Sequence, residues 1–341
     1  MPLLNGAVLA DLRRAAAHCA AGELLAFPTE TVYGLGARAD NDQAVARIFA
    51  AKGRPSEHPL IVHVASAAAA QFFSRDGVWA DDAQRLMDAF WPGPLTVIVA
   101  RHPQHGAAAA GGQDSIGLRM PAHPLALALL TEAAALGVPG VAAPSANRFG
   151  RVSPTTAAHV QAEFGPALWV LDGGACEVGI ESCIVDCRGP HPVLLRPGQI
   201  ERTLIEQALG RPLLQPGADA PRAPGTLASH YAPQARVSLW GSTELARRLA
   251  QPPAGPDKGQ QTTRPGAQSP PGVGVYSRLV APAGLGWFWR PMPADAAATA
   301  HELFAVLRDF DAAGVTALWI EQPPPGAEWD GVRDRLQRAA T

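Results

Sequence analysis

This chain of 341 residues has very little lysine: only Lys52 and Lys258 occur, and arginine supplies the rest of the 28 basic side chains. Charged residues make up 17% of the chain, and the formal net charge is -2. A protein that coats nucleic acid needs a basic excess, so that class is excluded, although a local basic groove stays open. With 47% hydrophobic residues the chain is globular rather than disordered, and it is long enough for two domains.

Cysteine is also scarce, and its spacing provides no Cys-x-x-Cys pair. A zinc site from Cys176, Cys183, Cys187 and His191 is one reading. However, the segment from Cys183 to Cys187 has the pattern of a strand, whose side chains alternate between two faces. We therefore expect these thiols, together with Cys19, to be buried and free.

Several common signatures are missing. No stretch approaches the length of a membrane span and no secretory signal is recognisable, so we expect a cytoplasmic protein with no membrane partner. The P-loop pattern G-x-x-x-x-G-K-[ST] and the nucleophile elbow G-x-S-x-G are both absent. Gly34-Leu-Gly-Ala-Arg-Ala39 meets the loose dinucleotide pattern, but a helix starts only after it has ended. We interpret its glycines as allowing a tight turn and keep nicotinamide binding as a weak alternative.

Strand and helix patterns alternate along the chain, and several strand patterns in the first two thirds follow one another directly. This predicts an α/β fold with a twisted mixed sheet in residues 1–210. Residues 236–341 predict a smaller Rossmann-like open α/β domain with parallel strands. The Pro/Gly/Ala-rich residues 211–235 predict a linker, and the low-complexity residues 252–271 a mobile loop.

The individual elements can be given by range. The predicted strands are 23–28, 60–64, 95–100, 116–120, 138–143, 168–172, 182–186, 193–196, 237–240, 273–276 and 315–320. The predicted helices are 9–21, 41–51, 81–90, 124–137, 200–209, 243–250, 296–313 and 329–340. Apolar residues at helical or alternating spacing define each of them.

Anion-binding side chains stand where these elements end. Lys52-Gly-Arg54 lies where a helix gives way to a strand, and two cations around a glycine can grip adjacent phosphates. A solvated helix end is the equally good alternative. Ser145 and Asn147 follow an apolar strand, and strand ends are the usual place for ligands in α/β proteins. A plain turn would have the same pattern.

Charged or titratable residues also occur inside strand patterns. His63 shares one face of its strand with Ile61, while its apolar neighbours face the other way. A structural histidine is the commoner reading of such a position. Arg119 stands among apolar residues and must find an anion, either a protein carboxylate or a ligand. Arg196 likewise follows directly on apolar strand residues.

Taken together, these groups indicate one kind of chemistry. They bind anions, but they include no activated nucleophile, no pair of acids and no metal cage. This suits an enzyme that positions its substrates and stabilises charge. We expect the bound anion to be a nucleotide phosphate chain.

The same motifs closely resemble the YrdC-like family. They are Pro28-Thr-Glu-Thr-Val-Tyr-Gly-Leu-Gly36, Lys52-Gly-Arg-Pro55, Pro59-Leu-Ile-Val-His63, Trp91-Pro-Gly-Pro-Leu-Thr96, Ala143-Pro-Ser-Ala-Asn147, Glu181-Ser-Cys-Ile-Val-Asp186 and Leu195-Arg-Pro-Gly198. Ser229-His-Tyr-Ala-Pro233 and the second domain resemble the long, two-domain form of that family. The resemblance covers residues 10–235 by motif and the rest by its α/β pattern.

This resemblance implies a nucleotidyltransferase that makes threonylcarbamoyl-AMP and pyrophosphate from L-threonine, bicarbonate and ATP, with Mg²⁺ on the triphosphate. A threonylcarbamoyl-transferase complex would then modify the adenosine beside the anticodon of certain tRNAs. The family's first domain has a concave basic face, which the linker crosses and the second domain covers. No covalent enzyme intermediate is implied.

The resemblance also implies roles for individual residues. Threonine contacts are implied for Thr31, His63, Arg119, Ala143 and Ser182. ATP contacts are implied for Lys52, Arg54, His58, Ser115, Ser145, Asn147, Ser153, Arg196 and Tyr231. Among these, Lys52, Arg54 and Arg196 would be catalytic, because they would stabilise the charge passing to pyrophosphate. Tyr231 would be the linker residue that closes over the nucleotide.

Two positions depart from the family pattern, and some rival readings remain. His58 replaces the usual Asn, and Cys183 replaces the usual Thr, which would leave more of the threonine binding to Ser182. A carbamoyl-transfer maturation factor would need zinc fingers that the four cysteines do not supply. An RNA-binding module without adenylate-forming activity is the main alternative, and a weak tRNA contact is compatible with either reading.

Overall fold

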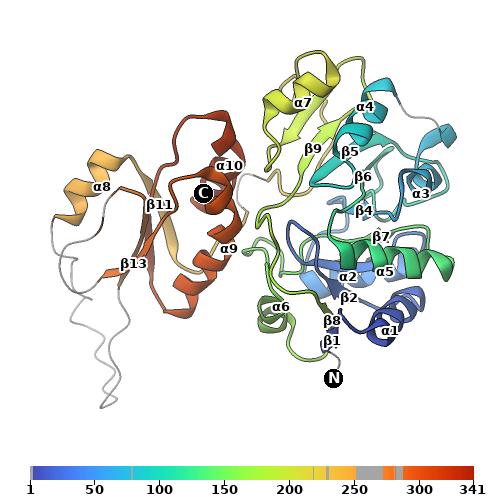
Figure 1. Ribbon diagram of the computed structural model, residues 1–341, viewed down its shortest axis with the longest axis horizontal. Helices are drawn as coiled ribbons and strands as arrows, with labels where there is room; N and C mark the ends of the chain where they lie inside the picture. The colour runs from blue at the N-terminus through green and yellow to red at the C-terminus, as the bar shows by residue number, and fades with distance from the viewer. Residues whose placement is uncertain are drawn as a thin grey trace. The chain divides into compact units, whose positions relative to one another are not determined.

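The computed structural model describes residues 3–77, 80–217, 219–227, 230–250, 272–279, 281 and 287–341. The chain divides into two compact units, which Figure 1 shows coloured along the sequence. Unit 1 comprises residues 1–149 and 153–227, and unit 2 comprises residues 150–152 and 228–341. The loop predicted at 252–271 lies outside the described residues, as do residues 218, 228 and 229 of the predicted linker.

Unit 1 contains a ten-stranded sheet in the order β1-β8-β2-β3-β7-β4-β6-β5-β9-β10. Its strands are β1 (Leu3–Asn5), β2 (Leu25–Phe27), β3 (Gly34–Arg38), β4 (Ile61–His63), β5 (Leu95–Ala100), β6 (Ser115–Arg119), β7 (Val141–Ala142), β8 (Trp169–Asp172), β9 (Cys183–Asp186) and β10 (Val193–Arg196). The pairs β1·β8, β2·β8, β4·β6 and β5·β9 are parallel, and the others are antiparallel. The predicted mixed sheet is therefore confirmed.

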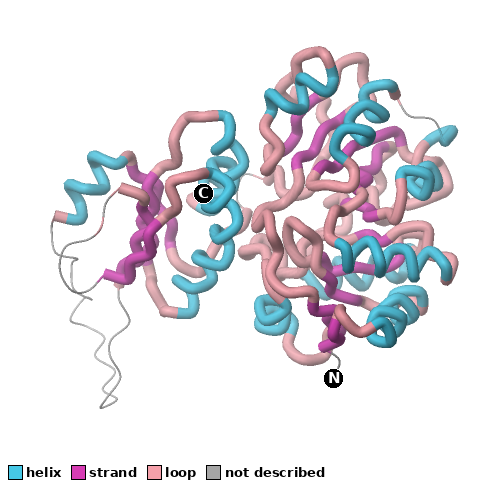
Figure 2. The backbone as a smooth tube through the Cα atoms, viewed as in Figure 1, coloured by secondary structure: helices cyan, strands magenta, loops and turns pink. Residues whose placement is uncertain are grey.

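Helices pack on the strands of this sheet (Figure 2). They are α1 (Leu9–Ala20), α2 (Asp42–Lys52), α3 (Ala67–Ala70), α4 (Asp81–Phe90), α5 (Pro124–Ala135), α6 (Ala157–Phe164) and α7 (Arg202–Leu209), with short 3-10 turns at Gln71–Phe73 and Arg75–Gly77. Helices α1 and α5 bury Leu12 and Leu129 against Phe27 of β2. The larger core contains Ile48 of α2 and Leu86 of α4. Burial of these apolar side chains is the main stabilising contribution to the unit.

The segment Gly34–Arg38 forms strand β3, so its interpretation as a tight turn is wrong. Glycine is needed at position 36 because the strand passes close to its neighbours. A Cβ atom there would lie 2.7 Å from Cε1 of Phe27 and 2.8 Å from Cγ1 of Val141. The glycines of this segment thus serve close packing inside a sheet rather than a change of chain direction.

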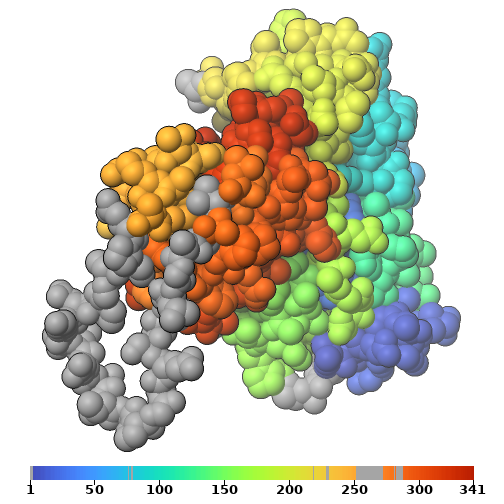
Figure 3. All heavy atoms as spheres, turned by 60° about the vertical axis from the view of Figure 1, so that its left-hand side comes forward, coloured from blue at the N-terminus to red at the C-terminus, as the bar shows by residue number. Residues whose placement is uncertain are grey.

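Unit 2 contains a four-stranded sheet in the order β11-β14-β12-β13, and all of its pairs are parallel, as predicted. The strands are β11 (Arg236–Trp240), β12 (Val273–Ser277), β13 (Trp287–Pro291) and β14 (Ala317–Glu321). The helices are α8 (Ser242–Leu249), α9 (Ala296–Ala312) and α10 (Asp330–Ala339), with a 3-10 turn at Ala327–Trp329. Helix α8 lies on one face of this sheet and α9 and α10 on the other (Figure 1), and α8 is at the surface (Figure 3).

Besides β3, the strands β1 and β13 and the helices α3 and α6 were not predicted from the sequence. Each is short or lies at the edge of its sheet. Among the described residues, no helix is long and apolar enough to span a bilayer.

Candidate active site

The central strands of unit 1 separate core residues from polar residues. Val62 of β4, Val97 of β5 and Leu118 of β6 belong to the main core. Because side chains alternate along a strand, the neighbouring His63 and Arg119 point to the opposite face. The predicted division of the β4 side chains between two faces is therefore confirmed. Two of the implied threonine-binding residues thus come from adjacent strands of one sheet face.

Arg119 ends β6 and is buried, with 3% of its surface exposed. Its Nε donates to the carbonyl of Gly93 at 3.2 Å, and its Nη1 donates to Oγ1 of Thr31 at 2.9 Å. Its Nη2 lies 2.7 Å from Oε1 of Glu30. The anion that a buried arginine requires is thus a protein carboxylate, which sequence reasoning had not singled out. His63 is the register partner of Arg119 on the adjacent β4.

The turn between β2 and β3 presents Thr31 and Glu30 to that arginine. The Thr29 hydroxyl donates to the Val32 carbonyl at 2.7 Å and accepts from the amides of Thr31 and Val32. The hydroxyls of Thr29 and Thr31 are 2.8 Å apart. Such side-chain bonds to neighbouring backbone groups stabilise turns. The motif Thr29-Glu-Thr31 is therefore a rigid platform rather than a flexible loop.

A second polar group surrounds Ser182, just before β9. Arg196 of β10 donates to the Ser182 carbonyl from Nε at 3.0 Å and from Nη2 at 2.9 Å, and Nη2 also reaches Oγ of Ser182 at 3.2 Å. The Ser182 hydroxyl lies 2.8 Å from that of Thr96 on β5. The structure therefore brings Ser182 and Arg196 together, and it adds Thr96, which was not among the site residues predicted from the sequence.

Lys52 lies at the end of α2, followed by Gly53 in the left-handed conformation (φ 63°) that ends the helix. Its Nζ donates to the carbonyl of Ser145 at 2.6 Å and to that of Asn147. Burial, and then the neighbouring charge of Arg54, hold the pKa of Lys52 well below its ordinary value. The structure thus joins three of the predicted ATP-binding residues at one point.

Arg54 and His58 both lie against Phe149. The guanidinium carbon of Arg54 is 5.5 Å from the ring centroid, and the ring of His58 meets it edge-on at 5.5 Å. Arg54 also donates to the carbonyl of Pro59 at 2.9 Å. Burial, followed by the charge of Arg54, lowers the pKa of His58. Phe149 is a further contact residue that carried no recognisable signal in the sequence.

Backbone hydrogen bonds connect the turn after β7 to the start of β3 and to β4. The Ala146 amide donates to the Tyr33 carbonyl at 2.8 Å, and the Leu35 amide to the Pro144 carbonyl at 2.8 Å. The Ala143 amide donates to the carbonyl of Ile61 at 2.9 Å. The turn after β7 therefore adjoins both the start of β3 and strand β4. This places the Ser145–Asn147 segment beside the turn that holds Thr31.

Three implied residues lie elsewhere in the network. The Ser153 hydroxyl is hydrogen-bonded to the carboxylate of Glu181, the residue before Ser182. Ser115, the first residue of β6, lines a narrow cavity together with Thr96 of β5. Tyr231 belongs to unit 2, where its ring stacks on that of Phe304 at a centroid distance of 5.5 Å.

The first part of the predicted linker lies on the polar face of unit 1. Ala223 packs in one cluster with Ile61, Ile98 and Ile184, which share that face. The carbonyl of Pro224 accepts a hydrogen bond from Nη1 of Arg196 at 2.9 Å. Residues 219–227 therefore contact the candidate site within unit 1.

Burial shifts the pKa of His63 and of two thiols of unit 1 away from neutral pH. Burial and then the charge of Arg119 lower the pKa of His63 to about 3, so its imidazole is neutral at neutral pH. The predicted buried free thiols are confirmed, and burial raises the pKa of Cys19 and Cys176 to about 12. Within the described ranges, no group of three or more His, Cys, Asp or Glu residues could hold a metal ion.

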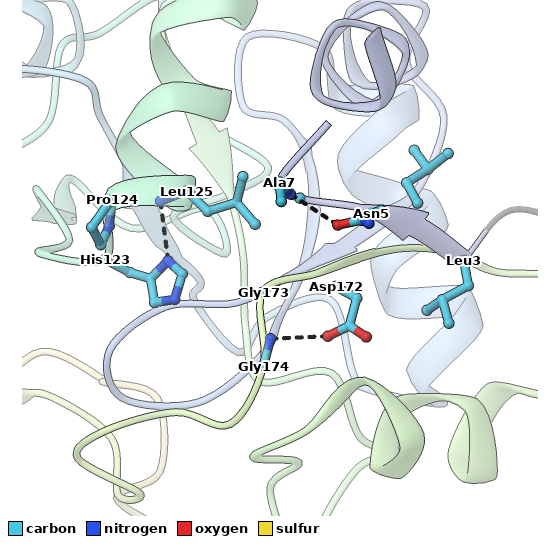
Figure 4. A pocket seen from close by; sticks show the side chains of 11 residues that line it. Leu3, Asn5, Ala7, His123, Pro124, Leu125, Asp172, Gly173 and Gly174 are labelled. Atoms are coloured by element: carbon cyan, nitrogen blue, oxygen red, sulfur yellow. Dashed lines mark hydrogen bonds between the residues drawn. The ribbon is translucent and has the colours of Figure 1, made fainter. Parts of the chain in front are cut away.

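A separate pocket of about 700 Å³ opens at the carboxyl ends of β1 and β8 and the start of α5 (Figure 4). Asn5, His123 and Asp172 are its main polar side chains, and none of the implied site residues lines it. The hydroxyl of Tyr33 donates to the Gly174 carbonyl at 2.7 Å and so links the site turn to the wall of this pocket.

Comparison with protein families gives two matches that together span most of the chain. The YrdC-type family described as "Telomere recombination" matches residues 18–198. The family described as "Threonylcarbamoyl-AMP synthase, C-terminal domain" matches residues 197–341.

Individual relatives agree with these matches. The threonylcarbamoyl-AMP synthase of Bacillus subtilis is 39% identical over 340 residues, which cover 97% of this chain and 93% of the relative. That of Pyrococcus abyssi is 42% identical over 232 residues, or 66% of each chain. The crystal structure of P. abyssi Sua5 complexed with L-threonine superposes with a TM-score of 0.82 at 33% identity, covering 97% of this chain and 94% of that one.

Proposed function

The chain belongs to the threonylcarbamoyl-AMP synthase family, and we propose that the polar face of unit 1 is where it makes threonylcarbamoyl-AMP and pyrophosphate from L-threonine, bicarbonate and ATP. Members of this family are nucleotidyltransferases that supply threonylcarbamoyladenosine modification of tRNA. The observation that supports the location is that Arg119 at the end of β6, Arg196 at the end of β10 and Lys52 at the end of α2 are each buried and each bonded to a motif residue.

The threonine side of the site would be formed around Arg119. Its guanidinium would pair with the carboxylate of threonine, because Gly93 and Thr31 accept hydrogen bonds from two of its five N–H groups and Glu30 is its ion-pair partner, which leaves donors for a ligand. The other threonine contacts would be Thr31, His63, Ala143 and Ser182. The L-threonine bound in the P. abyssi structure is consistent with such a site.

The ATP side would be formed around Lys52. Its ammonium group and the guanidinium groups of Arg54 and Arg196 would stabilise the negative charge that passes to pyrophosphate when the threonine carbamate attacks the α-phosphate. The remaining ATP contacts would be His58, Ser115, Ser145, Asn147, Ser153 and, from unit 2, Tyr231. No covalent enzyme intermediate is needed, because the carbamate itself is the nucleophile.

Mg²⁺ would reach the site on the triphosphate of ATP. Such an ion takes most of its ligands from phosphate and water, so a site without a cluster of protein carboxylates fits it. When bound it would neutralise phosphate charge. The downstream partner would be a threonylcarbamoyl-transferase complex that acts on tRNA, and the protein would work in the cytoplasm.

The product itself tests this function. The protein is incubated with ATP, L-threonine and ¹³C-labelled bicarbonate. The nucleotides are then separated, and their masses are measured by mass spectrometry. We expect an AMP derivative that carries threonine and the labelled carbon. A folded sample that forms no such nucleotide, but binds tRNA in a salt-dependent way, would instead support the RNA-binding alternative.

A further inference from the structure

Glu30 is a buried carboxylate that the roles described above leave unused. Only 5% of its side chain is exposed, and among the residues that the structure describes Arg119 is its one charged neighbour within ion-pair distance, at 2.7 Å. Neither carboxylate oxygen accepts a hydrogen bond from a residue in the described part of the chain. Buried carboxylates normally accept several hydrogen bonds, so this one has capacity for a further donor.

The backbone fixes Glu30 in this position. The Val178 amide donates to the Glu30 carbonyl at 2.7 Å, and the Gly179 amide donates to the Thr31 carbonyl at 3.1 Å. Together with the hydroxyl of Thr29, these bonds hold both ends of the Glu30 residue. The carboxylate is therefore preorganised beside Arg119 rather than swung in by a flexible loop.

An adjacent buried cation and anion match an amino-acid zwitterion. L-threonine carries a carboxylate and an ammonium group on one carbon atom. If Arg119 receives the carboxylate, a negative group is needed next to it for the ammonium, and Glu30 is the carboxylate that lies there. This complementarity concerns the main chain of the amino acid and is independent of its side chain.

The reaction also needs a base at the ammonium group. R–NH₃⁺ and HCO₃⁻ give R–NH–COO⁻, water and one proton. One of the three protons on nitrogen stays, one leaves in water with the hydroxyl group of bicarbonate, and one must be accepted by a base. The new C–N bond forms and the C–OH bond of bicarbonate breaks, with no oxidation or reduction.

We propose that Glu30 binds the ammonium group of L-threonine and accepts its proton as the carbamate forms. This rests on the proposed function and adds a catalytic residue to it. His63 is the register partner of Arg119 on β4 and is the alternative base. It is a poor one, because burial lowers the pKa of its imidazole. Glu181 is engaged by the hydroxyl of Ser153. The other titratable groups that act electrostatically on the Glu30 region are His123 and the thiol of Cys176.

Glu30→Gln tests this assignment, because glutamine keeps the size and loses the charge and the basicity. The rate of pyrophosphate release is measured against threonine concentration between about pH 6.5 and pH 9. At neutral pH we expect kcat/KM for threonine to fall about 100-fold, the lower range of general-base contributions. KM for ATP should stay unchanged.

The pH profile separates a base from a structural residue. Without Glu30 only the free amine reacts, so the rate of the variant should climb about tenfold per pH unit below the pKa of the substrate amine. The unchanged protein should lack this rise, so the ratio of the two rates should approach one as the pH increases. Glu132→Gln, which removes an acid from a surface ion pair with Arg13, is the matched control and should behave like the unchanged protein.

Two results would overturn the proposal: near-normal activity of Glu30→Gln at neutral pH, or a loss of activity that rising pH does not relieve. If Glu30→Gln does not fold, Glu30→Asp keeps the charge and withdraws the carboxylate, and a flat profile in that variant overturns the proposal equally. Absence of threonine-dependent release in the unchanged protein would instead refute the proposed function, so the two failures are distinguishable.

Discussion

At the scale of single residues, the site consists of cations held by oxygen atoms of the protein. Arg119 is held by Gly93, Thr31 and Glu30, and Lys52 by two backbone carbonyls. These bonds fix the direction of each cation before a substrate arrives. Preorganised charge of this kind stabilises a transition state without further rearrangement.

Replacement of Arg119 by lysine should affect threonine selectively. Lysine keeps the positive charge that Glu30 needs but loses the planar fork that can hold a carboxylate at two points. We expect KM for threonine to rise about tenfold and KM for ATP to change little. Steady-state pyrophosphate release, with one substrate varied at a time, measures both. Arg13→Lys, at an exposed ion pair, is the control, and an equal rise for both substrates would reassign Arg119.

The lowered pKa of Lys52 predicts an early alkaline limit. Only the ammonium form of Lys52 attracts phosphate. Because burial lowers the pKa of Lys52, the side chain loses its proton at a pH below the ordinary lysine pKa of about 10.4. kcat/KM for ATP, which reports the free enzyme, should therefore fall as the pH rises through this lowered pKa. In the Lys52→Arg variant the arginine keeps its charge throughout this pH range, so kcat/KM for ATP should not fall in the same way. The same alkaline limb in both proteins would show that another group causes it.

That Arg119 needs an anion could be predicted from the sequence, but the identity of that anion could not. Arg119 was recognised as needing an anion because a charge among apolar strand residues is expensive to bury. Its partner Glu30 stands in a turn 89 positions earlier in the chain, and only the folded sheet brings the two together. Thr96 and Phe149 were missed for the same reason, since their contacts with Ser182 and Arg54 are set by tertiary structure.

At the scale of elements, β3 shows how a glycine-rich strand escapes recognition. Glycine has low strand propensity, so Gly34–Arg38 reads locally as a turn. Glycine is needed at position 36 because the side chains of Phe27 and Val141 lie close to its Cα atom. Both residues belong to other strands, so the sequence around position 36 does not reveal this contact. The longer strands β5 and β6, with their apolar alternation, were predictable because their signal is local.

Gly36→Ala tests this explanation of β3. The added methyl group would overlap Phe27 and Val141, so we expect a loss of about 1–3 kcal/mol in the free energy of unfolding. For a unit of this size the melting temperature should drop by about 2–4 °C per kcal/mol. Gly189→Ala is the matched control, because the nearest atom to its new Cβ would be 3.9 Å away. Equal melting temperatures of the two variants would contradict the packing argument.

At the scale of the whole molecule, the candidate site is assembled from residues far apart in the chain. Thr31, Lys52, Arg119, Ser145 and Arg196 come from strands, turns and the end of helix α2 in unit 1. Tertiary contacts such as those of Arg119 with Thr31 and of Lys52 with Ser145 join residues that are distant in the sequence. The fold class was predictable because strands and helices alternate in a recognisable way. The strand order was not predictable, because it depends on long-range pairing that one sequence does not reveal. The boundaries of the linker remain a prediction.

We propose that this sheet face joins threonine, as its carbamate, to the α-phosphate of ATP with release of pyrophosphate. The most direct test is to measure pyrophosphate release from ATP and bicarbonate with each amino acid supplied in turn. We expect pyrophosphate release that requires L-threonine, with serine much poorer. No release with any amino acid, from a sample shown to be folded, would contradict it.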